Sequence, residues 1–449
     1  MSAAIDIALS GLRSSQLAID ITAHNVANAN VEGYSRQRPV AVTKLAQTSS
    51  QTFVGSGVDV QKVERLSDRW TAGHLRTEVA EQGYYDTLHE RLSEVEAVFN
   101  ETNTKGLGDA LNTFFQSVAQ LVDQPESPGH RAMVLANGDL LAARLRNADR
   151  QLRVIERDTR AQIASQVGVA NQLLDQVALL NRQIVGAGGS RADTNGLQDQ
   201  RDGLLRKLAE TLGARTLIDE DNSAVVSVEG TSLVLGGDAL LLSYGGSGFT
   251  IAENGQQIAV TKGQLGAMHE AVDQQNGILG QYVSDLDTMA STLIDRLNTL
   301  HSAGYGLDGS TGRDFFVGTN AGDIAVNPDL QAHPERFAAS ANGAAGNAEV
   351  ARAIAGVRDE PLLPGGGTID SYYEAVVGSI GVETAAAKAQ SEGLNSVVDQ
   401  IVTHSESLKG VSLDEEMTNL IRFQQAYNAS GRVVQIVKEM TDALLALRW

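Results

Sequence analysis

Apolar side chains recur every three or four residues at both ends of this 449-residue chain. Near the N-terminus the stripe consists of Ile5, Leu9, Leu12, Ile19, Ala23 and Val26. Near the C-terminus it consists of Leu413, Leu420, Phe423, Tyr427, Val434, Val437 and Leu444. Side chains at this spacing stand on one face of a helix. Each stripe must be covered, and the simplest covers are the other stripe and neighbouring copies of the chain.

The C-terminal helix carries a second apolar face, made of Ala426, Ala429, Val433, Ile436, Met440 and Leu447. A helix that is apolar on two sides needs two neighbours. We therefore hypothesise that both ends are poorly ordered in a free subunit and become helical when adjacent subunits cover them. The spacing alone equally fits an antiparallel terminal helix pair packed on an ordinary globular core.

Charge and composition exclude several classes of partner. The chain has 55 acidic and 35 basic side chains, a net charge of −20, which argues against nucleic acid or an anionic membrane as a partner. It has no cysteine, which excludes disulfides, thiol catalysis and thiolate metal sites. No run of about 18 apolar residues could span a bilayer. The first twelve residues lack the basic and apolar regions of a cleaved signal peptide, so we expect export without one.

The longest periodic element is expected over residues 129–185. Its stripe is Leu141, Leu145, Ala148, Leu152, Ile155, Thr159, Ile163, Val167, Ala170, Leu174, Val177, Asn181 and Ile184. A repeat of about 3.6 residues predicts a nearly straight helix of roughly 85 Å. The glycines that end it are Gly186, Gly188 and Gly189.

The remaining elements follow from spacing and turn residues. The first helix should stop in the Asn-rich stretch before Gly33, and residues 36–45 and 54–63 should form a small hairpin. Further helices are expected over 67–100, 107–122, 195–212, 264–300, 371–407 and 412–447. Asn195 should cap the helix that it begins, and Ser412 with Glu415 forms a capping box for the last helix.

The predicted fold class is mainly α with a β-rich insertion, arranged as a terminal helical coiled-coil layer, a long-helix bundle domain and an outer β domain. The terminal layer comprises residues 1–40 and 411–449. The long-helix domain comprises 41–212, 263–302 and 370–410. Residues 213–262 form the β-rich outer insertion, because short β-branched runs there are separated by Gly and Asn turns. Residues 303–369 are a Gly/Ala-rich segment expected to be irregular.

Catalytic and metal-binding patterns are weak in this sequence. The eight histidines are dispersed, without an H-x-x-x-H pair. Asp308, Ser310, Gly312 and Asp314 faintly suggest a cation loop, but a plain turn is the better interpretation. Carboxylates such as Glu415 and Glu416 are expected on a solvated first helical turn. We therefore predict no enzyme activity, no cofactor and no metal.

Four segments resemble a known protein family. Residues 25–37 read NVANANVEGYSRQ and residues 412–427 read SLDEEMTNLIRFQQAY. These resemble the N- and C-terminal signatures of the axial proteins of the bacterial flagellum, the rod, hook and hook-associated subunits. The chain has Val31-Glu32 where that family usually shows Thr-Pro. Residues 198–205 (QDQRDGLL) and 298–312 with Phe315-Phe316 point to the hook-associated branch.

The resemblance implies a structural subunit at the junction between hook and filament. Its implied partners are copies of itself in a ring, the hook protein on one side, a second junction protein and the filament on the other, and an export chaperone on the C-terminal helix. Its implied location is the extracellular flagellum. Alternatives are a hook or distal-rod protein and, less favoured, a secreted surface enzyme. The residues expected at the assembly interface are Ile5, Leu9, Leu12, Ile19, Val26, Asn28, Asn30, Gly33, Tyr34, Leu413, Met417, Leu420, Phe423, Tyr427, Val434, Val437 and Leu444.

Overall fold

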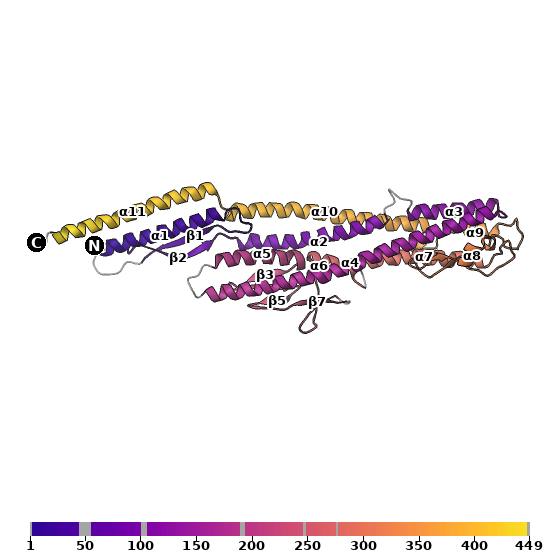
Figure 1. The fold of residues 1–449 in the computed structure, drawn as a ribbon, viewed down its shortest axis with the longest axis horizontal. Coiled ribbons are helices and arrows are strands. Elements are labelled where there is room, and N and C mark those ends of the chain that lie inside the picture. Colours follow the sequence, from indigo (N-terminus) through magenta and orange to yellow (C-terminus); the bar gives the residue numbers. More distant parts are fainter. Residues whose placement is uncertain are drawn as a thin grey trace.

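The fold is taken from a computed structural model that describes residues 2–44, 55–99, 106–188, 194–245, 248–274 and 277–446. Two residues used in the sequence-based expectations, Gly189 and Leu447, lie outside these ranges. The molecule is long and narrow, and the two chain ends lie together at one end of it (Figure 1). The chain is mainly α with small antiparallel sheets, which confirms the predicted fold class.

Helices, several of them long, make up most of the described chain. They are α1 (Ser2–Ala27), α2 (Arg69–Phe99), α3 (Leu107–Asp123), α4 (Pro128–Gly188), α5 (Asn195–Leu212), α6 (Gly263–Val272), α7 (Ile278–Ser302), α8 (Pro328–Ala332), α9 (Glu349–Gly356), α10 (Ile369–Lys409) and α11 (Leu413–Ala446). Three short 3₁₀ turns cover Pro334–Arg336, Val357–Asp359 and Pro364–Gly366.

The strands are short and pair antiparallel. They are β1 (Gln37–Thr43), β2 (Val58–Arg65), β3 (Arg215–Ile218), β4 (Ala224–Val228), β5 (Thr231–Leu235), β6 (Asp238–Ala239), β7 (Leu242–Gly245), β8 (Gly248–Ile251), β9 (Gln257–Ile258), β10 (Phe316–Val317) and β11 (Ala325–Val326). The first two form a hairpin in which Gln37 faces Arg65 and Thr43 faces Val58. Strands β3 to β6 form one sheet and β7 to β9 another.

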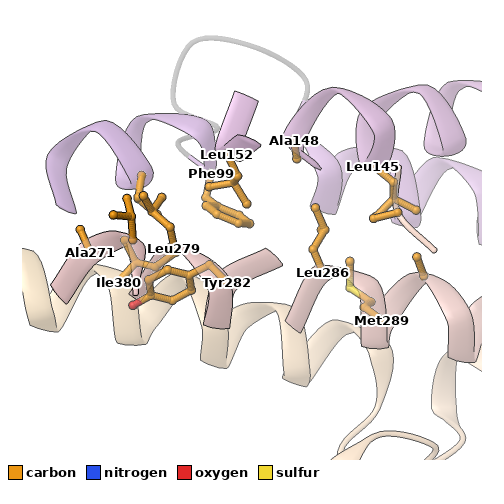
Figure 2. Close-up of a cluster of buried hydrophobic side chains, with 14 of the residues drawn as sticks. Phe99, Leu145, Ala148, Leu152, Ala271, Leu279, Tyr282, Leu286, Met289 and Ile380 are labelled. Carbon is orange, nitrogen blue, oxygen red and sulfur yellow. The ribbon is translucent and has the colours of Figure 1, made fainter. Parts of the chain in front are cut away.

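Helix α4 is the axis of the bundle. Its 61 residues give a length of about 90 Å at the usual rise per residue. Most of the predicted stripe is buried, and the two polar residues in it, Thr159 and Asn181, are fully buried as well. Side chains of α2, α4, α6, α7 and α10 meet in a continuous apolar core (Figure 2). Phe99 of α2 lies 6.5 Å from the ring centroids of both Tyr282 and Tyr373 and so joins three helices.

The β sheets lie along the side of α4, between the two ends of the molecule (Figure 1). Two asparagines of α4 hold them there. Asn171 exchanges two hydrogen bonds with the backbone of Leu242 in β7, and Asn181 binds the other sheet. The Asn181 Nδ2 donates to the carbonyl oxygens of Ala224 and Gly236, both at 2.8 Å, and its Oδ1 accepts from the Ala224 N–H at 2.9 Å. These bonds fix the sheet backbone against the helix. The end of the molecule far from the termini is formed by α3, α8 and α9 instead (Figure 1).

Residues 303–369, expected to be irregular, contain two strands, two helices and three 3₁₀ turns. Three phenylalanines, Phe315, Phe316 and Phe337, are almost fully buried and hold the segment against the bundle. Phe315 packs where α4 has Gly138, because a Cβ there would lie 2.8 Å from the Phe315 ring. The aromatic side chains compensate for the scarcity of regular backbone structure.

Two local predictions were wrong. The helix expected over 264–300 is interrupted between α6 and α7, where Asp273 is extended and Gly277 caps the second helix. The Gly277 backbone folds back on Asp273 so closely that a Cβ would lie 2.4 Å from its carbonyl oxygen. The N-cap of α5 is Thr194, whereas Asn195 is its first residue and donates to the Val63 carbonyl oxygen.

Candidate assembly interface

Helices α1 and α11 pack side by side and antiparallel at one end of the molecule (Figure 1). Asn25 near the end of α1 binds Glu416 in the first turn of α11, whereas Gly11 lies beside Ser430 further along. The two terminal helices thus cover part of each other. This is one of the two ways of covering the stripes that the sequence suggested.

Small residues of α1 form the seam with α11. The seam positions that are buried are Ala8, Ser15, Ala18, Thr22 and Asn25. A Cβ on Gly11 would lie 2.9 Å from the Ser430 hydroxyl oxygen, so the helices approach closely there. The sequence reasoning missed these positions because small side chains carry little hydrophobic signal. Their regular three- and four-residue spacing from Ala8 to Asn25 was the available sign.

The predicted stripe of α1 lies on a different face from this seam. At about 100° per residue, the stripe is rotated by roughly 100° from the line of small residues. Of its members, Leu9 and Ala23 are exposed, and the half-buried ones are Ile5, Leu12, Ile19 and Val26. One copy of the chain therefore leaves the stripe incompletely covered.

The α11 side of the seam follows the predicted stripe more closely. Val437 is buried, and Leu420, Phe423 and Val434 are half-buried. Much of the helix remains open to solvent. The large apolar residues of α11 that are between 38% and 57% exposed are Leu413, Met417, Ile421, Tyr427, Val433, Ile436, Met440, Leu444 and Leu445.

These exposed residues include two rows on opposite sides of the seam. The first row is Leu413, Met417 and Ile421, and the second row is Val433, Ile436, Met440 and Leu444. Helical geometry places each row roughly 100° from the seam, in opposite directions. Val433, Ile436 and Met440 of the second row belong to the second apolar face read from the sequence, whereas Leu444 was assigned to the first stripe. Two separate exposed rows can contact two different neighbours.

Asn25 joins the N-terminal helix to the hairpin and to α11. It is 1% exposed. Its Nδ2 donates to the Gln37 carbonyl oxygen at 2.9 Å and to Glu416 Oε2 at 3.0 Å. Its Oδ1 accepts from the Gln37 N–H at 2.9 Å and from the Tyr34 hydroxyl at 2.7 Å. All four hydrogen-bonding positions of the amide are therefore filled.

An arginine completes the connection between the two signature segments. Arg36 binds Glu415 at 2.7 Å and Glu416 at 2.6 Å, and its backbone N–H donates to the Lys409 carbonyl oxygen. Burial opposes the charge of Arg36, but the two carboxylates outweigh burial and raise its pKa. The expectation of solvated carboxylates was wrong for Glu416, which is 2% exposed because it lies between Arg36 and Asn25. The capping box is also incomplete, because the Glu415 side chain turns to Arg36.

The other predicted residues of the N-terminal signature form the turn after α1. Gly33 has φ +80°, a conformation that favours glycine. Asn28 donates to the His24 carbonyl oxygen, and Asn30 is exposed. The Tyr34 hydroxyl lies 3.0 Å from His24 Nδ1 and bonds Asn25. These residues position the interface helices, and Tyr34 reaches the seam through its bond to Asn25.

The internal segment 198–205 ties the hairpin to the bundle. Asp199 of α5 accepts from the Ser35 N–H at 3.1 Å and pairs with Arg65 at 2.9 Å. Arg65 also binds Asp202 at 2.7 Å, and Arg206 binds Glu32 at 2.8 Å. The segment is therefore a joint between the terminal helices and the long-helix bundle.

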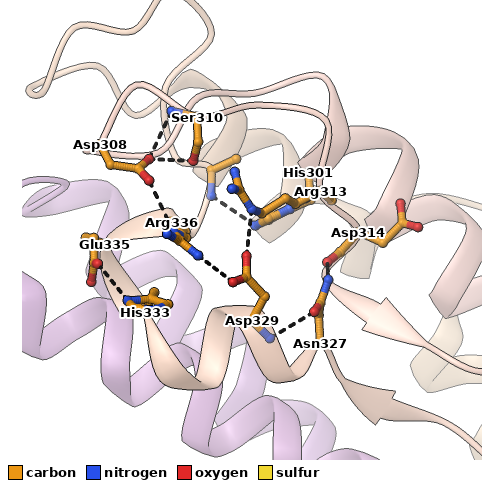
Figure 3. Close-up of polar contacts among 11 residues, drawn as sticks. His301, Asp308, Ser310, Arg313, Asp314, Asn327, Asp329, His333, Glu335 and Arg336 are labelled. Atoms are coloured by element: carbon orange, nitrogen blue, oxygen red, sulfur yellow. Dashed lines mark hydrogen bonds and ion pairs between the residues drawn. The ribbon is translucent and has the colours of Figure 1, made fainter.

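The loop that faintly suggested a cation site is occupied by ion pairs (Figure 3). Asp308 lies 3.3 Å from Arg336 and accepts from the Ser310 N–H at 2.9 Å. Asp329 pairs with both Arg313 and Arg336. Within the described ranges, no group of three His, Cys, Asp or Glu residues is arranged to hold a metal ion. Among the helices described, none combines the length and the hydropathy that a membrane span requires.

Three models of known protein families match the middle and the two ends of this chain. The model of the flagellar hook-associated protein FlgK helical domain matches residues 92–316, half of the chain. The chain belongs to the FlgK family. Models of the flagellar basal body rod FlgEFG protein C-terminal region and of the flagella basal body rod protein match residues 408–447 and 5–34. The matches at the two ends cover α11 and α1, the two helices of the interface.

Relatives of the FlgK family align over nearly the whole chain. Flagellar hook-associated protein 1 of Bacillus subtilis is 28% identical, over 98% of this chain and 97% of the relative. The Escherichia coli protein of the same name is 26% identical over the full length of both. A solved structure, the flagellar hook junction protein FlgK from Burkholderia pseudomallei, shares the fold with a TM-score of 0.63 at 15% identity, covering 76% of this chain and all of that one.

Proposed function

We propose that this chain is a structural subunit of the bacterial flagellum that forms the junction between hook and filament. The observation that carries the proposal is the exposure of two rows of large apolar side chains on α11. Full burial of one such side chain contributes roughly 1.5 to 3 kcal/mol, so covering both rows favours assembly strongly. Its membership of the FlgK family supports the location in the flagellum.

The assembly is head to tail, with each copy contacting two different neighbours. The two rows differ in residues and lie on opposite sides of the seam. Different surfaces that meet across one repeated contact generate a ring or a helix rather than a two-fold dimer. This arrangement fits a ring of copies within an axial tube. The residues of this contact include the exposed apolar members of the predicted interface, Leu9, Leu413, Met417, Tyr427 and Leu444.

The finer partners follow from the same reasoning. They are the hook protein on one side, a second junction protein and the filament on the other, and an export chaperone that shields α11 before assembly. The subunit leaves the cell without a cleaved signal peptide and acts outside it, and it has no enzymatic role. The alternative of a hook or distal-rod protein is disfavoured by the match to the FlgK helical domain, which includes α4.

The test replaces a member of the second row in a bacterium that lacks its own copy of the gene. Ile436→Asp places a charge in the proposed contact, and we expect hooks without filaments. The purified variant should keep the helix content of the parent, because Ile436 is exposed in a single copy. Val382→Asp, at an exposed position on α10, is the matched control and should restore filaments.

Normal filaments with Ile436→Asp would contradict the proposed contact. Deleting the gene separates the two axial roles: loss of filaments with hooks retained supports the junction, whereas loss of hooks supports the hook or distal rod.

A further inference from the structure

We propose that the second row of α11 in one copy packs against the first row of α11 and the stripe of α1 in the next copy, with the two copies displaced by about 30 Å along the helix axis. The inference rests on the proposed assembly of copies and specifies which surfaces meet in it. It follows from where the apolar and charged side chains of the two terminal helices lie.

The hairpin covers one side of α1 and leaves the stripe open. On the covered side the Val58 N–H donates to Ser10 Oγ at 3.1 Å, and a Cβ on Gly57 would lie 3.3 Å from the Ile7 Cα. Viewed along the helix at about 100° per residue, Ile7 and Ser10 lie on one side of the seam and the stripe lies on the other. The stripe therefore faces away from the hairpin, where a neighbouring copy can reach it.

The two rows of α11 face opposite sides of the helix pair. Both helices are right-handed and they run antiparallel, so successive residues turn in opposite senses when both helices are viewed from one end. The first row then lies on the same side as the α1 stripe, and the second row lies on the side of the hairpin. The first row and the stripe together make one apolar face, and the second row makes the opposite one.

The two faces also lie at different levels along the axis. Asn25 binds Glu416 and Gly11 lies beside Ser430, so the first row is level with the end of α1 and the second row with its beginning. The midpoints of the rows are about 21 residues apart, or roughly 32 Å. When the second row of one copy covers the first row of the next, the copies are displaced by that distance.

An acidic and a basic side chain of α11 have nearly the same spacing as the rows. Asp414 and Arg432 are both exposed and stand on the side of α11 turned away from α1, about five helical turns or roughly 27 Å apart. Arg36 binds Glu415 and Glu416, and among the described residues neither Asp414 nor Arg432 has an ion-pair partner in its own copy. The displacement brings Arg432 of one copy within about a turn of Asp414 of the next. This charge complementarity favours a second copy as the occupant of both rows.

The first experiment cross-links the full-length chain in isolated flagella. The chain has no cysteine, so thiols can be introduced at chosen positions. Met417→Cys with Met440→Cys places one thiol in each row, and each substitution is also made alone. Met417→Cys with Met133→Cys is the matched control, because Met133 is comparably exposed but lies on α4. The flagella are treated with a short bismaleimide that bonds two thiols.

We expect the variant with thiols in both rows to give dimers, trimers and higher multiples of the chain on a denaturing gel. The two positions are about 35 Å apart on one helix, too far for a short linker within one copy. The single variants and the control pair should stay monomeric, because unlike surfaces meet in the proposed contact.

The second experiment reverses the charges and measures binding of the purified chain to isolated hooks. Asp414→Arg or Arg432→Asp alone places like charges across the contact and should raise the half-saturating concentration about fivefold. The double reversal restores opposite charges and should bind within about twofold of the wild type. Arg157→Asp, at a position of α4 that is 73% exposed, is the control and should bind like the wild type.

Monomers alone from the variant with thiols in both rows would overturn the inference while leaving the proposed function intact. Multiples formed by a single variant would do the same, because like positions would then meet. A double reversal that binds no better than the single reversals would contradict the proposed displacement. Absence of the wild-type chain from flagella, or its failure to bind hooks, would instead count against the proposed function.

Discussion

Buried polar side chains determine which surfaces of the chain pack together, both at the two ends and along α4. Asn25 fills all four of its hydrogen-bonding positions between α1, the hairpin and Glu416. Asn181 does the same between α4, the β4 backbone and Arg201. Each of these groups is costly to bury and is compensated only in one arrangement, so they specify which surfaces meet.

Changing Asn25 to Asp should loosen the terminal helices. The carboxylate cannot donate to Gln37 or Glu416, and it places a second negative charge beside Glu416. We expect a loss of about 3 kcal/mol or more in the free energy of unfolding of the terminal helices. Hydrogen exchange of α1 measures it. Asn28→Asp, at a position with a single bond to the His24 carbonyl oxygen, is the control. Equal exchange rates in the two variants would argue against this role of Asn25.

His301 should make stability depend on pH. Its Nδ1 faces the Arg313 carbonyl oxygen, and its Nε2 accepts from the Ala338 N–H, so the ring is bound in its neutral form. Burial lowers the pKa of His301 to about 4. The unfolded chain, with a pKa of about 6.5, binds the proton more readily, so stability is present above about 6.5 and is lost as the pH falls to about 4.

The size of that loss is on the order of 3 kcal/mol. The measurement is the free energy of unfolding of the wild type minus that of His301→Gln, whose side chain does not titrate, between pH 7 and pH 4. The difference should fall by this amount. A difference that stays constant over the range would mean that His301 does not carry the effect.

At the scale of helices and strands, long periodic segments were predictable and their partners were not. The α4 stripe was correct because a buried face along a 61-residue helix repeats many times. The α1 seam was missed because it consists of small residues. The position of the β sheets could not be predicted, since it depends on Asn171 and Asn181 of α4, two polar residues that bind sheet backbone more than 40 positions away. The burial of Glu416 likewise depends on Arg36, which lies far away in sequence.

Two glycines of α2 should respond oppositely to alanine. A Cβ at Gly83 would lie 2.7 Å from the Glu210 carbonyl oxygen of α5, so Gly83→Ala should cost about 1 to 3 kcal/mol by forcing the helices apart. Gly73 has no atom within 4 Å of its added Cβ, and Gly73→Ala should stabilise the helix by about 0.5 to 1 kcal/mol. Chemical denaturation compares the two variants. Destabilisation by both substitutions, or by neither, would show that the close contact of α2 with α5 does not determine whether alanine lowers or raises the free energy of unfolding.

At the scale of the whole molecule, a single copy leaves large apolar side chains of α11 exposed to solvent. The bundle buries a continuous apolar core, whereas α11 leaves two apolar rows exposed in the half of the rod that carries the chain termini. A net charge of −20 makes free copies repel one another, and in the proposed assembly the rows offset this repulsion. Family membership, the antiparallel terminal helices and the exposed rows all point to assembly as the state in which the molecule is complete.

The methionines allow this to be measured directly. Met417 and Met440 belong to the two rows and are 52% and 53% exposed, Met133 on α4 is 48% exposed, and Met268 and Met289 are buried. Mild peroxide oxidation, read by mass spectrometry, compares free chain with isolated flagella. We expect Met417 and Met440 to oxidise readily in the free chain and to be protected about tenfold or more in flagella, with Met268 and Met289 slow in both. Oxidation of Met417 and Met440 at the same rate in flagella as in the free chain would show that neighbouring copies do not cover α11.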